Sequence, residues 1–298
     1  METLIQPLVT PFFDPATGTF SYVVKDPGSP AACVIDPVLD YDPESRGLST
    51  HSARRVLDYV LRAGLEVHWI LETHAHADHL TAAQWLKREL GHSPRVGIGQ
   101  GILQVQRTFK EKLRLGDDFF ADGRDFDVLF TEGDVFPVGA LQTRVLSTPG
   151  HTPDSVSYLI GDAVFVGDTL FAPNYGTARC DFPGGDARAL YQSMMRLLSL
   201  DESTRIFLCH DYPAEGATPQ FLSNPAEQRL GNIHLRNNVE VDAYVEMRQS
   251  RDATLKAPRL LEPSLRVNVR AGHIADSAVS AHGLPSSGLG MDESSFSN

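Results

Sequence analysis

The segment His74-Ala75-His76-Ala77-Asp78-His79 constrains this chain more than any other feature of its sequence. Four side chains of the kinds that bind metals fall within six residues. His74 and His76 are two positions apart in an extended stretch, so they point the same way. Imidazoles packed this closely are unfavourable unless something such as a metal keeps them neutral. Imidazole and carboxylate together suit zinc, iron or manganese, so the segment predicts a metal centre.

The segment 74–79 directly follows an expected strand over 67–73. Three later polar residues also stand directly after an expected strand. These residues are His151, Asp168 and His210, which follow the expected strands 140–147, 163–167 and 205–209. Loops at one edge of a sheet converge on a common site. We therefore expect all three side chains to join the histidine-rich segment.

The pattern of apolar residues predicts alternating strands and helices with some hairpins, one of them turning at Gly161-Asp162. Further strands are expected over 18–25, 31–37, 95–99, 127–130 and 155–160. Helices are expected between Thr50 and Gly64 and over 79–90, 101–115, 186–198, 225–237 and 238–253. Hairpins among alternating elements favour a mixed sheet, or two sheets with outer helices, over a purely parallel sheet.

Composition excludes several classes of function. The 298 residues include 26 Lys+Arg and 38 Asp+Glu, a formal charge of −12, which disfavours general nucleic-acid binding. The longest apolar run, Ala31–Ile35, is far shorter than the roughly 18 residues of a membrane span. The first residues lack the basic and apolar regions of a secretory signal. With three cysteines and no C-x-x-C pair, we expect a reducing, cytoplasmic compartment.

The order of the motifs resembles the metallo-β-lactamase superfamily. H-x-H-x-D-H is followed by Gly150-His151, by Gly167-Asp168 after an apolar strand, and by the late His210. The resemblance covers residues 1–270 and implies one α/β domain, an αββα four-layer sandwich of two mixed sheets with outer helices. Its C-terminal helical part would span about 221–260. Residues 271–298, rich in Ser and Gly, are expected to be a poorly ordered tail.

Three further features are similar to the persulfide dioxygenases (sulfur dioxygenases), which are related to glyoxalase II. They are the run from Tyr175 to Gly185, Asp211-Tyr212 after the late histidine, and the stretch from Asn224 to Arg236. Cys180 stands where mitochondrial members more often carry Thr, which places the chain nearer the bacterial branch.

This resemblance implies a glutathione-dependent enzyme of hydrogen sulfide detoxification. Such an enzyme oxidises glutathione persulfide with O₂ to sulfite and glutathione at one Fe(II) per chain. The implied iron ligands are His74, His151 and Asp168, a facial triad that leaves coordination positions open. His76, Asp78, His79 and His210 would then surround the iron and hold its geometry.

A second reading stays open. All seven residues also match a dinuclear centre bridged by Asp168, as in a glyoxalase II-like thioester hydrolase. A persulfide-binding protein without catalysis is a third and weaker hypothesis. Metal content separates the first two, and oxygen uptake separates an enzyme from a binder.

The substrate pocket is predicted from charge together with the motif after Asp168 that carries the resemblance. Glutathione carries two carboxylates, so a protein of charge −12 needs local cations to bind it. The candidates are Tyr175, Arg179, Arg236 and Cys180. Arg179 either contacts a glutathione carboxylate or pairs with Asp181, and Cys180 either approaches the substrate sulfur or packs in the core. No nucleic acid or membrane partner is expected, and a homodimer is left open.

Overall fold

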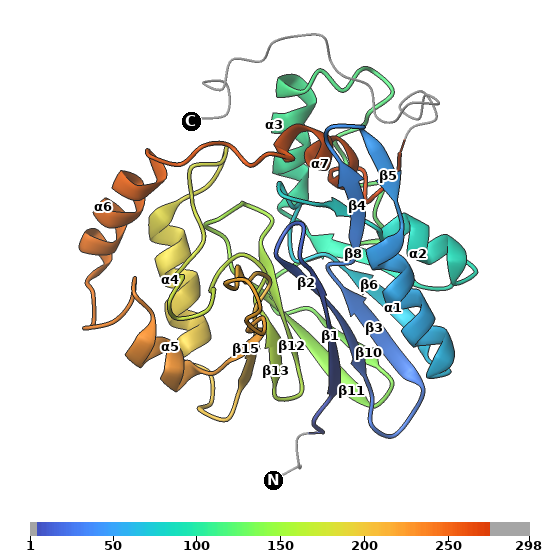
Figure 1. The fold of residues 1–298 in the computed structure, drawn as a ribbon, viewed down its shortest axis with the longest axis horizontal. Helices are drawn as coiled ribbons and strands as arrows, with labels where there is room; N and C mark the ends of the chain where they lie inside the picture. Colours follow the sequence, from blue (N-terminus) through green and yellow to red (C-terminus); the bar gives the residue numbers. More distant parts are fainter. Residues whose placement is uncertain (1–4, 275–298) are drawn as a thin grey trace.

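Two six-stranded mixed sheets lie face to face in the computed structural model, which describes residues 5–274 (Figure 1). The first sheet has the order β1-β2-β3-β6-β8-β9: β1 (Leu8–Asp14), β2 (Thr19–Lys25), β3 (Ala31–Ile35), β6 (Glu66–Leu71), β8 (Arg95–Gly99) and β9 (Val128–Phe130). The second has the order β10-β11-β12-β13-β14-β15: β10 (Val135–Val138), β11 (Leu141–Ser147), β12 (Val156–Ile160), β13 (Ala163–Phe165), β14 (Arg205–Phe207) and β15 (Leu222–Ser223). A small sheet holds β5 (Gly47–Ser49), β4 (Val38–Asp42) and β7 (Leu80–Thr81).

Both large sheets mix parallel and antiparallel pairs. In the first, β1, β2 and β3 are antiparallel, whereas β3, β6, β8 and β9 run parallel. In the second, only β13 and β14 run parallel. The expected tight hairpin is confirmed, because Ile160 pairs with Ala163 across Gly161-Asp162 and Gly161 has a φ of 58°.

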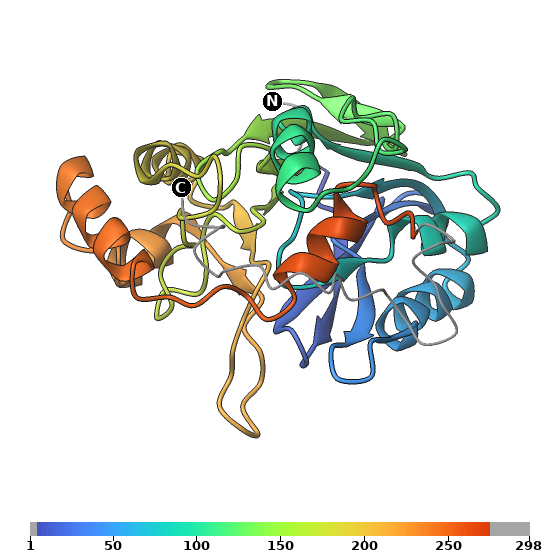
Figure 2. The same ribbon diagram turned by 90° about the horizontal axis from the view of Figure 1, so that it is seen from above.

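Helices cover the outer faces of the two sheets (Figure 2). On the first sheet lie α1 (His51–Arg62), α2 (Ala83–Glu89), α3 (Ile102–Lys112) and α7 (Leu261–Asn268); beside the second lie α4 (Ala187–Leu198), α5 (Pro225–Gly231) and α6 (Val241–Asp252). The start of α4 follows from Asp186, whose carboxylate accepts hydrogen bonds from the backbone N–H groups of Arg188 and Ala189. Leu190 and Met194 form part of its buried stripe.

Alternation along each strand separates three apolar cores. In β6, Ile70 packs under the helices of the first sheet while Leu71 faces the second sheet. In β14, Phe207 faces the first sheet and Ile206 packs under α4. Successive side chains of a strand point to opposite faces, so one strand serves two cores. The expected αββα four-layer sandwich is confirmed.

Several expected boundaries are wrong. The helix expected over 79–90 begins at Ala83, because Leu80–Thr81 instead pairs with β4 and the Thr81 N–H donates to Asn268 Oδ1 at 2.8 Å. The helix expected over 225–237 ends at Gly231. Strands β1, β4, β5, β7, β10 and β15 and helix α7 were not predicted. Tertiary pairing decides such short elements, and local periodicity does not reveal it.

The C-terminal boundary also lies later than expected. Ala271 is fully buried and packs with the core of the first sheet, so the predicted tail does not begin there. Residues 275–298 lie outside the described residues.

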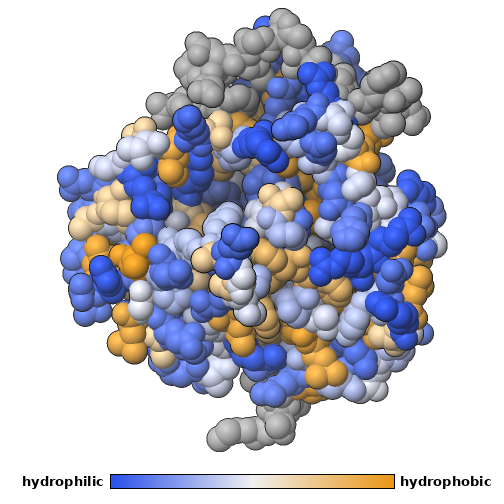
Figure 3. Space-filling model, in the orientation of Figure 1, coloured by the Kyte–Doolittle hydropathy of each residue, from blue (hydrophilic) through white to orange (hydrophobic). Residues whose placement is uncertain are grey.

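On the face shown in Figure 3, hydrophilic residues cover most of the surface, with smaller apolar groups between them. Within the described part of the chain, no helix is long and apolar enough to cross a membrane.

Candidate metal centre

The four strand-end positions meet at one edge of the two sheets. His74 follows β6 of the first sheet, whereas His151, Asp168 and His210 follow β11, β13 and β14 of the second. Because β13 and β14 are parallel neighbours, their carboxyl ends lie side by side. All four side chains are buried. The sequence-based expectation that these loops converge therefore agrees with the geometry.

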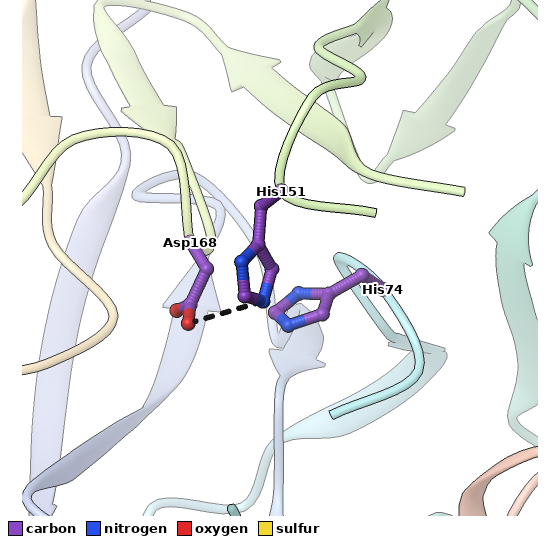
Figure 4. Close-up of side chains that lie close together, drawn as sticks. All are labelled: His74, His151 and Asp168. Atoms are coloured by element: carbon purple, nitrogen blue, oxygen red, sulfur yellow. Dashed lines mark ion pairs between the residues drawn. The ribbon is translucent and has the colours of Figure 1, made fainter. Parts of the chain in front are cut away.

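His74, His151 and Asp168 form one group of potential metal ligands (Figure 4). Each offers one ligand atom, and these atoms lie within 4.8 Å of one another. His151 Nε2 is 3.6 Å from Asp168 Oδ2, and the rings of His74 and His151 are perpendicular with centroids 5.1 Å apart. Although burial alone raises it, the pKa of Asp168 is held well below its usual value by His210 and His151. Two imidazoles and a carboxylate in this arrangement suit a mononuclear transition metal.

The orientation of both imidazoles is set by acceptors behind them. His151 Nδ1 lies 2.7 Å from the carbonyl oxygen of Arg179, which can only accept, so Nδ1 carries the hydrogen. His74 Nδ1 lies 3.1 Å from Thr73 Oγ1, and that hydroxyl donates to Asp36 Oδ2 at 2.9 Å. In each ring Nε2 is then left as the free ligand atom. His74 Nε2 is buried and has no hydrogen-bond partner among the described residues.

A glycine lets the His151 loop approach its neighbour. A Cβ on Gly150 would lie 2.3 Å from the backbone nitrogen of Leu190 in α4, and its φ is 140°. The carbonyl of Gly150 accepts a hydrogen bond from the Asp186 N–H at 2.8 Å. This close approach anchors His151 on the first turn of α4.

A second group of potential ligands adjoins the first. His76, Asp78 and His79 also bring one ligand atom each to within 4.8 Å of one another. His210 Nε2 lies 3.1 Å from Asp168 Oδ1 and 3.4 Å from Asp78 Oδ2, which links both groups. Among the described residues, buried His76 Nδ1 and His79 Nε2 have no hydrogen-bond partner. These orphaned buried atoms fit a metal centre, because an unpartnered buried polar atom is otherwise costly.

Sequence reasoning missed two carboxylates behind His76. Its Nε2 lies 3.1 Å from Asp36 Oδ1 and 3.7 Å from Glu72 Oε2, and both carboxylates are buried. Burial opposes protonation of His76, but Asp36 and Glu72 outweigh it and raise the pKa to about 9. Burial, reinforced by Asp36, raises the pKa of Glu72 to about 8. Asp36 follows the strand Ala31–Ile35, so the strand-end signal that identified Asp168 could have found it.

Asp154 is another residue that sequence reasoning missed. Its Oδ2 accepts a hydrogen bond from the Ala75 N–H at 2.7 Å, and its side chain is fully buried. This contact ties the loop after His151 to the middle of the histidine-rich segment. It therefore fixes the two ligand-bearing loops relative to one another.

A cavity of about 380 Å³ opens onto the centre, within the range of ligand pockets. Asp78, His151, Asp168 and His210 form its floor. Its walls combine aromatic and apolar side chains with arginines: Phe171, Tyr175, Phe182, Tyr212, Leu255, Pro258, Arg179, Arg248 and Arg251. Four of these wall residues come from α6 and the segment after it, about a hundred residues beyond His151: Arg248, Arg251, Leu255 and Pro258.

The predicted substrate residues divide into two pairs. Tyr175 and Arg179 line the cavity, but Cys180 and Arg236 are not among its lining residues. The Cys180 side chain packs in the core formed with α4 and α6, and Arg236 lies exposed after α5. Arg179 makes a bidentate pair with Asp181, with both N···O distances 2.6 Å, and donates to the Lys256 carbonyl at 2.7 Å. Arg179 thus pairs with Asp181, which is the second of the two roles expected for it from the sequence.

Comparison with known proteins agrees with the fold. Residues 14–210 match the family model of the metallo-beta-lactamase superfamily. The chain belongs to the metallo-β-lactamase superfamily. It is 46% identical over 275 residues to a probable metallo-hydrolase of Burkholderia pseudomallei, covering 89% of this chain and 93% of that protein. It is also 46% identical to Glyoxylase B2 of Dictyostelium discoideum over 267 residues, covering 89% and 90%.

More distant superfamily relatives carry the name expected from the sequence. The mitochondrial persulfide dioxygenase ETHE1 of Homo sapiens is 26% identical over 268 residues, covering 89% of both chains. The crystal structure of ETHE1 from Myxococcus xanthus superposes with a TM-score of 0.70 at 28% identity, covering 89% of this chain and all of that one. The resemblance to the persulfide dioxygenases is therefore real but distant, and nearer relatives have hydrolase or glyoxalase-type names.

Proposed function

We propose that this protein is a glutathione-dependent persulfide dioxygenase with one Fe(II) held by His74, His151 and Asp168. The observation that carries the proposal is the convergence of these two imidazoles and one carboxylate, of which His151 and Asp168 line an open cavity. A facial triad of this kind leaves positions for both a sulfur ligand and O₂. Iron, when bound, supplies the redox chemistry that side chains lack. The likeness to ETHE1 supports the same choice.

The cavity wall supports an anionic, sulfur-containing substrate. Arg251 is exposed and lines the cavity, and among the described residues its side chain has no hydrogen bond or ion pair. A guanidinium without a protein partner is available to a substrate carboxylate. Phe171 and Phe182 cover the rings of His210 and His151 edge-on, with centroids 5.9 Å and 5.2 Å apart. These apolar walls would exclude water while the persulfide sulfur lies at the floor.

Arg179 contributes through its backbone in this proposal. Its carbonyl orients His151 at 2.7 Å, while its guanidinium holds Asp181. We therefore assign Arg179 a positioning role, and Arg251 the carboxylate-binding role first expected of Arg179. Cys180 and Arg236 are not part of the proposed substrate pocket, because neither lines the cavity. Since Cys33, Cys180 and Cys209 are all free, we also propose a reducing, cytoplasmic compartment.

A glyoxalase II-like thioester hydrolase is the second candidate. The observation in its favour is the second group of His76, Asp78 and His79, which has the donors for another metal. In that case Asp168, which lies close to both His151 and His210, would lie between the two ions. The identity of 46% to proteins named metallo-hydrolase and Glyoxylase B2 adds weight.

Metal analysis combined with two assays tests the proposal. The full chain, produced with both iron and zinc available, is expected to hold about one iron and to consume O₂ with glutathione persulfide. The products should be sulfite and glutathione in equal amounts. Two zinc ions per chain, with hydrolysis of S-lactoylglutathione and no oxygen uptake, would instead establish the hydrolase. His151→Ala serves as the control for metal-independent reaction of the persulfide.

A further inference from the structure

Thr19 places one hydroxyl against three side chains of the metal centre. Its Oγ1 lies 3.3 Å from His210 Nδ1, 3.4 Å from His79 Nδ1 and 3.4 Å from Asp78 Oδ2. The residue is fully buried at the start of β2. The mechanism proposed above makes no use of it.

The backbone fixes Thr19 at this position. Thr19 forms an isolated antiparallel bridge with His210, although the two residues belong to different sheets. The Phe20 N–H donates to the Cys209 carbonyl at 2.7 Å, and the Asp211 N–H donates to the Gly18 carbonyl at 3.0 Å. The hydroxyl is therefore held rigidly where the two sheets meet.

The directions of the hydrogen bonds among Asp14, Thr17 and Thr19 follow from the number of hydrogens that each group can donate. Thr17 Oγ1 lies 2.6 Å from Asp14 Oδ2 and 2.8 Å from Thr19 Oγ1. A carboxylate only accepts and each hydroxyl has one hydrogen, so Thr17 donates to Asp14. Thr19 then donates to Thr17, since that contact is 0.6 Å shorter than its contact of 3.4 Å with Asp78. Asp14 is held in turn by the N–H groups of Ala16 and Thr17.

The consequence concerns the two histidines. With its hydrogen directed to Thr17, the Thr19 oxygen can only accept at His79 and His210, so each Nδ1 carries the hydrogen. Two further acceptors agree, because the Gly18 carbonyl lies 3.3 Å from His210 Nδ1 and Asp78 Oδ2 lies 3.5 Å from His79 Nδ1. Nε2 of both rings then faces the metal centre.

We propose that Asp14, Thr17 and Thr19 form a one-way hydrogen-bond chain that keeps a hydrogen on Nδ1 of His79 and His210. The three are positioning residues, since only Thr19 touches the histidines and none touches the reacting atoms. The chain presents Nε2 of both rings to the centre, either as ligands of a second metal or as partners of metal-bound water. This role does not depend on which of the two functions above is correct.

Nuclear magnetic resonance of ¹⁵N-histidine-labelled protein tests the proposal directly. Long-range proton–nitrogen spectra show which ring nitrogen carries hydrogen, and His79→Asn and His210→Asn assign the signals. In both the metal-free and the zinc-loaded full chain, we expect hydrogen on Nδ1 of both residues. A neutral ring with hydrogen only on Nε2, at either residue, would overturn the proposal without any variant of the chain.

Variants separate this role from simple packing. Thr19→Val keeps the shape but removes the hydroxyl, and we expect mixed tautomers at His79 with zinc affinity lowered about 10–100-fold. Thr19→Ser should restore both, and Thr10→Val, whose hydroxyl donates to the Tyr59 hydroxyl and to no side chain of the metal centre among the described residues, should change neither. If Thr19→Val fails to fold, Thr17→Val tests the same chain one link away. Unchanged tautomers and zinc affinity in the folded variant would contradict the proposal.

Discussion

Four imidazoles of the metal centre each have one ring nitrogen within hydrogen-bond distance of a protein oxygen. His151 uses the Arg179 carbonyl, His74 uses Thr73 and Asp36, and His79 and His210 share Thr19. Such partners fix the ring and leave the other nitrogen free for a metal. Single substitutions should therefore distinguish residues that bind the metal from residues that orient the metal ligands.

His151→Ala and His210→Ala should differ in metal content. Under the one-iron proposal, His151→Ala loses most of its iron because one of three protein ligands is gone. His210→Ala should retain iron and lose about 10–100-fold in affinity or activity, since it acts through Asp168 and Asp78. Elemental analysis and melting temperature of both variants check this. Complete loss of metal from His210→Ala would favour the dinuclear centre.

Arg251→Gln should weaken substrate binding without affecting the metal. A charge-assisted contact is worth on the order of 2 kcal/mol, so KM should rise about tenfold or more while kcat and iron content stay close to the original values. Arg236→Gln is the matched control, because Arg236 is an exposed arginine outside the cavity lining. Equal KM values for the two variants would remove Arg251 from the proposed pocket.

At the scale of elements, α6 completes the cavity from far along the chain. Arg248 is fully buried and pairs with Asp252 one turn later, with an N···O distance of 2.5 Å, and its Nη1 donates to the Thr177 carbonyl at 3.1 Å. Asp252 also accepts from the Cys180 N–H at 2.8 Å. The helix thus clamps the loop whose Arg179 carbonyl orients His151.

Arg248→Ala should destabilise the protein by about 3–5 kcal/mol, because it leaves the buried Asp252 carboxylate unpaired. Arg251→Ala, on the exposed side of the same helix, should change stability little. Urea unfolding of both variants measures the difference. Removing Asp252 together with Arg248 should cost less than the sum of the single changes, and strict additivity would argue against the clamp.

His234 should make stability depend on pH. Burial, with the charges of Arg248 and Arg251, lowers its pKa to about 4, and its Nδ1 accepts from the Thr177 N–H at 3.0 Å. Below the ordinary histidine pKa the unfolded chain binds a proton that the folded chain excludes, so stability is full near neutral pH and falls as pH drops towards 4. An ordinary pKa of about 6.5 in the unfolded chain and a pKa of about 4 in the folded chain give a loss of at most about 2 kcal/mol between pH 7 and pH 5.

His234→Gln is the control for this pH dependence, since a glutamine oxygen can still accept from Thr177. Urea unfolding at both pH values should show the smaller decrease in the glutamine variant. Because other groups titrate equally in both proteins, the difference between the two decreases isolates His234. Identical decreases would show that His234 is protonated as readily in the folded chain as in the unfolded one.

Across the whole molecule, the sequence predicted those features that depend on local order along the chain. Polar residues directly after apolar strands identified His151, Asp168 and His210, and the motif order indicated the sandwich. The wall supplied by α6 and the contact of Thr19 with His210 could not be predicted in this way. Both depend on segments that are far apart in sequence, and only the packing of the two sheets brings them together.

Removal of the metal should lower the stability of the whole sandwich, because the metal centre joins loops from both sheets. A ligand that binds only the folded chain stabilises it by about 2.7 kcal/mol at a hundred times its dissociation constant. For a chain of 298 residues, whose unfolding entropy is about 2.1 cal/mol/K per residue, that corresponds to roughly 4 °C in melting temperature. Scanning calorimetry with and without a strong chelator measures the shift, and adding iron or zinc back should reverse it. His151→Ala should melt near the temperature of the chelated protein and respond little to chelator. A chelator shift of full size in that variant would mean that the stabilising metal lies elsewhere than among His74, His151 and Asp168.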